Sequence, residues 1–310
     1  MKRNKKELQY YQSLSLADKI ALTKTKIVEF YDSFNGYIYI SFSGGKDSTV
    51  LLHLVRELYP NVKATYIDTG LEYPEVKTFV KSFDNLDIVR PSMSFKEVLD
   101  TYGWVFPSKD IAMTIYYARQ GSKWAIDRLS GIDKNGVESK FRQRYKKWQF
   151  LVDAPFKISH RCCIIMKDLP AQKYERKLNL HPLVAIMAEE SQRRQSSWIK
   201  SGCNIFDSNR PISRPMSFWT EQDVLRYIKD NNLKIPSVYG EIKEKDNKLV
   251  TTGEQRTGCI FCPIGCHLHE TSKFKRLKTT HPKIFDYCMN QLKLKDFLDF
   301  LGENLKKELY

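Results

Sequence analysis

The stretch from Tyr37 to Val55 changes from a strand pattern to a helix pattern across two adjacent glycines. Its first residues, YIYI, alternate aromatic and β-branched side chains, which is typical of a buried strand. The segment TVLLHLVREL spaces its apolar side chains at helical intervals. The connection SFSGGKDS is therefore a tight turn, where glycine allows a ligand to approach the backbone closely. Because N–H groups at a helix start attract anions, the turn predicts a phosphate site.

Further apolar runs, each followed by a polar loop and a helical pattern, predict strands at residues 62–68, 86–90 and 182–188. Strands that alternate with helices predict a Rossmann-like α/β fold with a doubly wound parallel sheet. Ligands in such sheets bind at the carboxyl ends of the strands. Three polar segments come after predicted strands, so we expect them to meet in one crevice: SGGKDS, Asp68-Thr69-Gly70 and AEES at 188–191.

The same patterns divide the chain into three parts. Residues 1–30 predict an N-terminal helical segment, and residues 31–210 predict the nucleotide-binding α/β core. A helical insertion interrupts that core at about residues 92–180. Residues 211–310 form a C-terminal segment with a second group of cysteines and a basic helical tail.

The formal net charge of +15 favours polyanionic partners. Five basic residues lie among aromatics in KFRQRYKKW at 140–148, and five occur without an acid in TSKFKRLKTTHPK at 271–283. These two segments are candidates to contact DNA or tRNA, and the alternative is that each is a solvated helical face. No apolar run approaches the roughly 18 residues that a bilayer span needs. We expect no membrane association and a cytoplasmic location.

Seven cysteines are present, an odd number that argues against a disulfide framework and for a reducing compartment. Cys162 and Cys163 are adjacent, and Cys259, Cys262 and Cys266 follow in GCIFCPIGCH. The C-x-x-C spacing places two thiolates on one metal ion or cluster edge. Adjacent cysteines are hard to arrange around one tetrahedral zinc, but structural Zn²⁺ remains the alternative to an iron–sulfur cluster.

The loop matches neither the GxxxxGK[ST] pattern nor the GxGxxG fingerprint. SGGKDS instead resembles the PP-loop of the ATP pyrophosphatase superfamily, whose members cleave ATP between the α- and β-phosphates. The resemblance implies that Ser43, Gly44, Gly45 and Ser48 cradle pyrophosphate. Lys46 would neutralise the developing charge, and Asp47 would hold the loop or Mg²⁺. Lys46, Asp47 and Ser48 are thus candidate catalytic residues.

Two further segments resemble the wider phosphoadenosine phosphosulfate (PAPS) reductase family. AEESQRR at 188–194 is similar to its substrate loop, which implies that Glu190, Ser191 and Arg194 bind the adenine nucleotide together with Asp68, Thr69 and Gly70. Residues 210–242 are similar to a second family segment. Arg193, Arg194 and Arg210 are candidates for bidentate contacts with phosphate or sulfate oxygens.

The cysteine pattern CC…CxxC resembles that of assimilatory adenylylsulfate reductases, which bind a [4Fe–4S] cluster. The resemblance implies that Cys162, Cys163, Cys259 and Cys262 are the cluster ligands. Lys167 matches a lysine that lies near the cluster in that family. Cys266 is an additional thiol, and it is either a redox or sulfur-carrying catalytic residue or an inert neighbour.

Two departures from the reductases favour an ATP-consuming relative. Reductases carry their nucleophilic cysteine in a Glu-Cys-Gly-Leu-His tail, whereas this sequence ends FLGENLKKELY. Their loops also generally differ from the full SGGKDS form. We therefore expect an enzyme that adenylates an acceptor, such as a nucleic acid, for sulfur incorporation with a sulfur-donor protein. The alternatives are a sulfonucleotide reductase that forms sulfite and a non-catalytic iron–sulfur module that binds nucleic acid.

Overall fold

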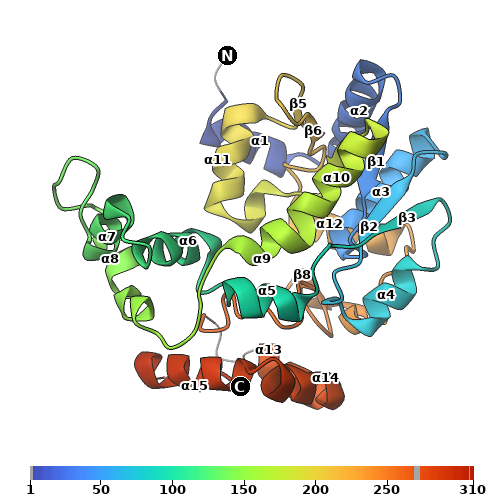
Figure 1. Cartoon of the computed structure of the whole chain (residues 1–310). Coiled ribbons are helices and arrows are strands. Elements are labelled where there is room, and N and C mark those ends of the chain that lie inside the picture. Colours follow the sequence, from blue (N-terminus) through green and yellow to red (C-terminus); the bar gives the residue numbers. More distant parts are fainter. Residues whose placement is uncertain (1–2, 269–272, 307) are drawn as a thin grey trace. The chain divides into compact units, whose positions relative to one another are not determined.

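The computed structural model describes residues 3–268, 273–306 and 308–310 (Figure 1). The chain forms two compact units. The first, here called the sheet unit, comprises Met1–Asp68, Glu72–Arg90 and Pro170–Gly258. The second, called the cysteine unit, comprises Thr69–Leu71, Pro91–Leu169 and Cys259–Tyr310. These boundaries differ from the division predicted from the sequence, because residues 211–258 group with the sheet.

The sheet unit is built on six strands in the order β3-β2-β1-β4-β6-β5. Their bounds are β1(Ile38–Ser41), β2(Ala64–Ile67), β3(Leu86–Val89), β4(His181–Val184), β5(Asn204–Ile205) and β6(Ile212–Ser213). Neighbouring strands pair in parallel, except for the antiparallel pair of β5 and β6. The predicted doubly wound α/β fold is thus confirmed. The order reverses at β1, so the loop after β1 begins at the switch point where such folds bind ligands.

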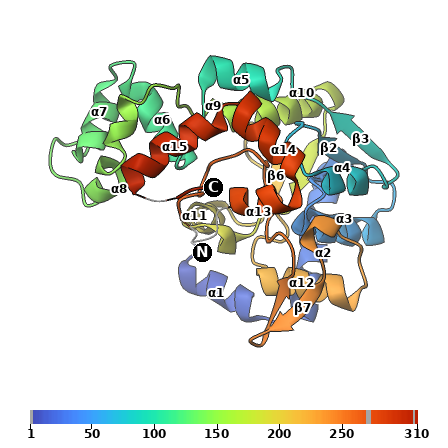
Figure 2. The same cartoon turned by 90° about the horizontal axis from the view of Figure 1, so that it is seen from below.

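Helices cover the sheet, which explains why its first strand is apolar on both faces (Figures 1 and 2). Ile38, Tyr39 and Ile40 of β1 are all buried. The helices of this unit are α1(Lys5–Ser13), α2(Leu16–Ser33), α3(Lys46–Leu58), α4(Pro74–Val80), α10(Leu169–Leu178), α11(Gln192–Ser201) and α12(Glu221–Asp230), with the short helices η3(Ala188–Glu190) and η4(Ser237–Tyr239).

A hairpin of β7(Ile242–Lys245) and β8(Lys248–Thr251) explains why residues 211–258 belong to the sheet unit. Its two-residue turn, Asp246-Asn247, has φ values of +52° and +57°, which suit a tight hairpin turn. The Gln222 side chain of α12 donates to the Leu249 carbonyl at 2.9 Å and accepts the Leu249 N–H at 2.8 Å. The hairpin is therefore fixed to α12, a helix that itself packs against α3.

The cysteine unit is helical and has an aromatic core. Its helices are α5(Phe95–Tyr102), α6(Lys109–Ala118), α7(Lys123–Ser130), α8(Arg142–Lys146), α9(Arg161–Cys163), α13(Lys273–Thr280), α14(Pro282–Asp286) and α15(Leu294–Leu305), with the short η1(Gln149–Val152), η2(Ile164–Asp168) and η5(Tyr287–Gln291). The Phe297 ring of α15 lies 5.5 Å from Trp104 and 4.8 Å from Phe156 between centroids. The predicted insertion and the C-terminal helices thus share one core. None of the described helices combines the length and apolar character needed to cross a bilayer.

Candidate functional site

The loop between β1 and α3 contains a glycine that no other residue could replace without strain. Gly44 has a φ of +72°, in the left-handed region. A Cβ atom there would lie 2.5 Å from Val80 Cγ2 and 2.9 Å from Val76 Cγ1. Helix α4 therefore packs directly against the loop. Gly44 has a steric role in addition to the phosphate contact that the family resemblance implies.

The two serines of the loop hold each other. The buried Ser48 hydroxyl accepts the Ser43 N–H at 3.2 Å and donates to the Gly45 carbonyl at 3.0 Å. Ser43 Oγ lies 3.0 Å from Ser48 Oγ. Since the Ser48 proton points to the carbonyl, Ser43 is the donor in this hydroxyl pair. Ser48 thus braces the loop, whereas Ser43 is exposed at its outer side.

Three hydroxyl oxygens surround the α-carbon of Gly45, the N-cap residue of α3. A Cβ atom on Gly45 would lie 3.4 Å from both Ser43 Oγ and Tyr239 OH, and 3.7 Å from Thr257 Oγ1. The Tyr239 hydroxyl accepts the Lys46 N–H at 3.4 Å and lies 2.6 Å from Thr257 Oγ1. Within the described residues no side chain caps α3. The helix start therefore faces hydroxyl groups that can donate to an oxyanion.

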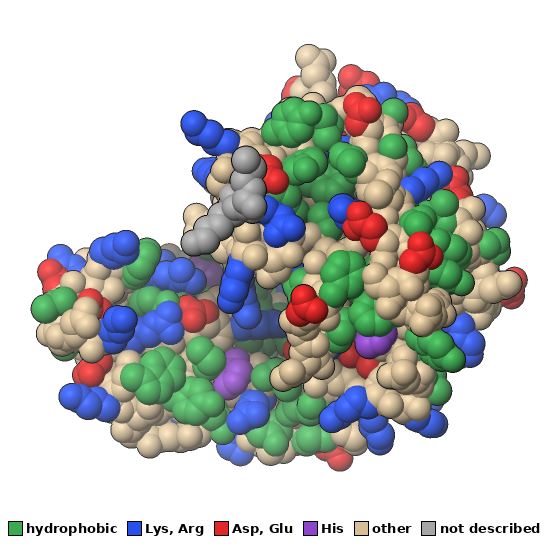
Figure 3. Space-filling model, turned by 90° about the horizontal axis from the view of Figure 1, so that it is seen from above, with side chains coloured by type: hydrophobic (Ala, Val, Ile, Leu, Met, Phe, Trp, Pro, Cys, Tyr) green, Lys and Arg blue, Asp and Glu red, His purple; other side chains and the backbone are tan. Residues whose placement is uncertain are grey.

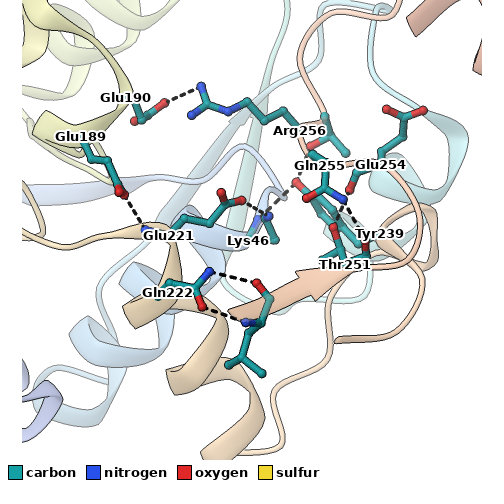
Figure 4. A network of polar contacts seen from close by, with 12 residues as sticks. Lys46, Glu189, Glu190, Glu221, Gln222, Tyr239, Thr251, Glu254, Gln255 and Arg256 are labelled. Carbon is teal, nitrogen blue, oxygen red and sulfur yellow. Dashed lines mark hydrogen bonds and ion pairs between the residues drawn. The ribbon is translucent and has the colours of Figure 1, made fainter. Parts of the chain in front are cut away.

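Lys46 brings a buried positive charge to this helix start (Figure 4). Only 4 % of its side chain is exposed, and its Nζ lies 5.3 Å from the centroid of the Tyr239 ring. The ammonium group donates to Glu221 Oε1 at 2.8 Å. Glu189 accepts the Glu221 N–H at 2.7 Å and so fixes the start of α12. A bound phosphate would compete with the Glu221 carboxylate for Lys46.

The predicted substrate-loop residues Glu190, Ser191 and Arg194 form contacts of their own, and Figure 4 shows the Glu190 carboxylate paired with Arg256. Ser191 accepts the Arg194 N–H at 3.3 Å and thereby caps α11. The Glu190 carboxylate forms ion pairs with Arg194 and, at 3.3 Å, with Arg256. Two arginines therefore share one carboxylate, and an incoming anion could recruit either of them.

The charges that act on Asp47 come from several elements of the sheet unit. Burial raises the pKa of its carboxyl group, and the neighbouring Lys46 lowers it. Glu221 raises the pKa again, while Arg256 and Arg194 lower it. The loop, α12 and α11 thus contribute charges to a single polar region. The predicted residues Lys46, Asp47 and Arg194 lie together in it.

The other predicted residues follow β2 or lie in α11. Asp68 forms ion pairs with Lys77 at 3.1 Å and Arg90 at 3.5 Å. Thr69 and Gly70, the next residues, belong to the cysteine unit. Arg193 is exposed at the start of α11.

Arg210 makes a bidentate ion pair within the sheet unit. Both of its bonds to the Glu175 carboxylate measure 2.7 Å, and Glu175 also accepts the Tyr39 hydroxyl at 2.8 Å. Because Tyr39 lies on β1, this pair supports the sheet.

The cysteine unit brings the four predicted ligand thiols together. Burial raises the pKa of Cys162, and the charges of Cys163, Cys259 and Cys262 raise it further. The charges of Cys259 and Cys262 thus reach Cys162, although these residues are far apart in sequence. In the described part of the chain, no group of three or more His, Cys, Asp or Glu side chains is arranged so that it could hold a metal ion.

Lysines from separate elements surround these thiols. Burial raises the pKa of Cys163, while Lys109 lowers it through its charge and a hydrogen bond and Lys167 lowers it through its charge. Burial also raises the pKa of Cys262, which Lys273 lowers. Lys273 Nζ donates to the Cys259 carbonyl at 3.1 Å. Cysteine sulfurs with cations nearby are the type of donor that iron–sulfur clusters and zinc use, and the cations would favour the deprotonated form that such ligands need.

The remaining cysteines are buried. Cys266 is only 3 % exposed, and Cys203 lies in the sheet unit. Burial raises the pKa of Cys288 to about 12, and Lys273 lowers it. Lys273 therefore acts on both Cys262 and Cys288, a connection that spacing in the sequence did not indicate.

The two basic segments differ from the sequence interpretation in one respect. Tyr145 and Trp148, two of the aromatics among the cations of 140–148, are buried at 5 % and 2 % exposure. Of the aromatics in this segment only Phe141 is open to solvent. In the second segment Lys273 binds a carbonyl group and Lys275 pairs with Glu308 at 2.6 Å. Residues 271 and 272 of that segment lie outside the described residues.

Sequence reasoning missed several residues of the loop site. Tyr239, Glu221, Arg256 and Thr257 all act at α3 or its neighbours, yet none was a predicted site residue. One signal was present, since the segment similar to the PAPS reductase family includes Glu221 and Tyr239. Arg256 and Thr257 become neighbours of the loop only when residues 254–257 fold against it.

The sheet is doubly wound and mostly parallel, and a serine–glycine loop with a buried lysine lies at its switch point. These features define a Rossmann-like α/β protein. The chain belongs to the phosphoadenosine phosphosulfate reductase domain family, which matches residues 37–110 and 112–272. The predicted family is thereby confirmed. The likeness to DNA-phosphorothioation proteins and the role of the CC…CxxC motif stay predictions.

Several known proteins resemble the chain. Two uncharacterized proteins of Methanocaldococcus jannaschii are 25% and 24% identical over 298 and 288 residues, 94% and 90% of this chain. The chain spans about half of their length, 55% and 46%. An adenosine 5'-phosphosulfate reductase of Bacillus cytotoxicus is 22% identical over 76% of this chain and 77% of its own. A PAPS reductase crystal structure from Candida auris, a phosphate complex, covers 80% of this chain and 98% of its own, with 14% identity and a TM-score of 0.41.

Proposed function

We propose that this chain is an ATP pyrophosphatase that activates an acceptor for sulfur incorporation. An acceptor oxygen would attack the α-phosphorus of ATP, the bond to the β-phosphate would break, and pyrophosphate would leave. A sulfur nucleophile from a donor protein would then displace AMP. The observation that carries the proposal is the helix start at Gly45, with its surrounding hydroxyls and the buried Lys46.

Each group of the loop site has a role in this reaction. The N–H groups of α3 would hold the leaving pyrophosphate, together with the Ser43 hydroxyl once its proton turns from Ser48 to a phosphate oxygen, and Lys46 would neutralise the charge of the pyrophosphate. Asp47 would help to hold Mg²⁺, which binds carboxylates together with nucleotide phosphates. Arg194 and Arg256 would release Glu190 and bind phosphate oxygens.

The cysteine group supports a second part of the proposal. Cys162, Cys163, Cys259 and Cys262 would hold a [4Fe–4S] cluster, with Zn²⁺ as the alternative occupant. Adjacent cysteines can bind different corners of a cluster, which a single zinc ion does not offer. When bound, a cluster would supply electron-transfer or sulfur-binding chemistry. Lys109, Lys167 and Lys273 would offset the negative charge of the thiolates.

The family match favours one competing function, a sulfonucleotide reductase that forms sulfite. In that reaction a thiolate attacks the sulfate sulfur and the nucleotide leaves. Cys266 is the candidate nucleophile, but its side chain is buried. This burial disfavours direct attack on a bound nucleotide.

Anaerobic protein with Mg²⁺ separates the two functions. We expect ATP to yield pyrophosphate, faster with an added nucleic acid, and we expect no sulfite from PAPS or adenylylsulfate with thiol reductant. Cys266→Ser should leave pyrophosphate release within about twofold of the wild type, since Cys266 has no part in cleaving ATP. Sulfite formation that Cys266→Ser abolishes while the iron content is kept would establish the reductase instead.

Tyr239→Phe tests the hydroxyl group that sequence reasoning missed. Its removal takes one donor from the phosphate site, so we expect the Kd for ATP to rise about tenfold, or roughly 1.4 kcal/mol. Isothermal titration calorimetry measures this change. Tyr287→Phe, at an exposed ring of the cysteine unit, is the matched control. An unchanged Kd for ATP in Tyr239→Phe would remove Tyr239 from the site.

A further inference from the structure

One lobe of the cysteine unit carries a concentrated positive charge. The basic lobe, residues 119–148, contains nine Lys or Arg residues and three Asp or Glu residues, a net charge of +6. It includes α7 and α8, and Figure 3 shows Lys and Arg side chains spread among hydrophobic ones over this part of the molecule. Its exposed cations are Lys123, Lys134, Lys140, Arg142, Arg144, Lys146 and Lys147.

Three of the arginines in the lobe form ion pairs with carboxylates, whereas its lysines do not in the described part of the chain. Arg128 and Arg144 both pair with Asp110, and Arg142 pairs with Glu138. Within the described ranges the five lysines of the lobe form no ion pair. These lysines can therefore bind phosphates without first giving up a carboxylate partner.

Two aromatic rings lie exposed among these cations. Trp124 is 46 % exposed, and its inner side packs against Tyr117 with 5.7 Å between centroids. Phe141 is 55 % exposed, and Lys140 Nζ lies 5.2 Å from its centroid. An exposed ring can stack on a nucleobase, while an adjacent ammonium group contacts phosphate.

We propose that the basic lobe binds single-stranded nucleic acid, with its lysines on phosphates and Trp124 and Phe141 stacked on unpaired bases. A single strand fits better than a duplex, because stacking on these rings needs bases with a free face. Helix α13 is a weaker candidate, because Lys273 and Lys275 are already bound within the unit. The inference rests on the proposed function, since it names the class of acceptor.

Fluorescence anisotropy with labelled strands of about 20 nucleotides tests the charge contribution. The nucleotide-free full chain is titrated with single-stranded DNA, single-stranded RNA and a duplex of the same sequence, at several salt concentrations. Lys140→Gln/Lys146→Gln/Lys147→Gln should reduce the slope of log K against log salt by about 2, from three lost phosphate contacts. Lys243→Gln/Lys245→Gln/Lys248→Gln, an equal charge change on the β7–β8 hairpin, should leave the slope unchanged.

Alanine variants test the stacking contribution. Trp124→Ala and Phe141→Ala should each weaken single-strand binding at least about fivefold, and Tyr10→Ala, at another exposed ring, should not. The inference would be overturned if the chain bound the duplex as tightly as the single strand and if Trp124→Ala and Phe141→Ala left both affinities unchanged. Binding only to phosphatidylserine vesicles would overturn it too. The binding assay contains no ATP and is independent of the assay for pyrophosphate release. A chain that binds the strand but releases no pyrophosphate in that second assay would refute only the proposed function. Pyrophosphate release that depends on nucleic acid and is unchanged in the lysine triple variant would refute only the role of the basic lobe.

Discussion

Lys46→Met is expected to lower the rate of pyrophosphate release from ATP by at least about 100-fold. The ammonium group is 4 % exposed at the start of α3, so its charge acts with little screening by water. In the proposed reaction this ammonium group would offset the negative charge that develops on the leaving group. Methionine keeps the length of the side chain and its packing on Tyr239, and it removes only the charge. The Glu221 carboxylate left behind is 42 % exposed and can be solvated.

The rate needs two accompanying measurements. Thermal unfolding should show that Lys46→Met still folds, and single-turnover kinetics at saturating ATP should separate loss of binding from loss of chemistry. Lys245→Met, which removes an exposed lysine from the β7–β8 hairpin, is the control and should keep the wild-type rate. A Lys46→Met protein that releases pyrophosphate at the wild-type rate would rule out this loop as the catalytic site.

The second large effect is expected at the cysteine group. Cys259→Ala should reduce the iron and acid-labile sulfide of anaerobically purified protein at least about tenfold, with loss of the visible absorbance of the cluster. One ligand of four would be missing, and the affinity of a thiolate site depends on its complete donor set. The measurement counts metal, so it does not depend on knowing the reaction.

Cys203→Ala is the matched control, because Cys203 is buried in the sheet unit and its loss should leave the iron content unchanged. If the wild type held one zinc ion per chain and no iron, and if Cys259→Ala lost this zinc, the alternative metal would be established. Full iron content in Cys259→Ala would show that Cys259 is not a ligand. Unfolding measured in the same preparations shows whether metal loss accompanies a loss of fold.

The nucleotide-loop half of the fold could be predicted from the sequence because its signals are local. The strand at Tyr37–Ile40, the glycine turn and the following helix each follow from the periodicity of a few residues. The structure places them at Ile38–Ser41 and Lys46–Leu58, displaced by at most a few positions. The short strands β5 and β6 gave no such signal, since two residues are too few for a period to be visible. The family followed from the order of these local motifs.

The tertiary structure alone decided which side chains share a site. Tyr239 and Thr257 reach Gly45 only because α12, the β7–β8 hairpin and residues 254–257 fold back onto the sheet unit. Tyr145 and Trp148 lie among the basic residues of 140–148 in the sequence, but the packing of their lobe buries them. Local periodicity reports which face of an element is apolar, whereas contacts between distant segments depend on how the elements pack. The sequence by itself therefore determined the loop and the family, and the fold determined the hydroxyls and charges that surround the loop.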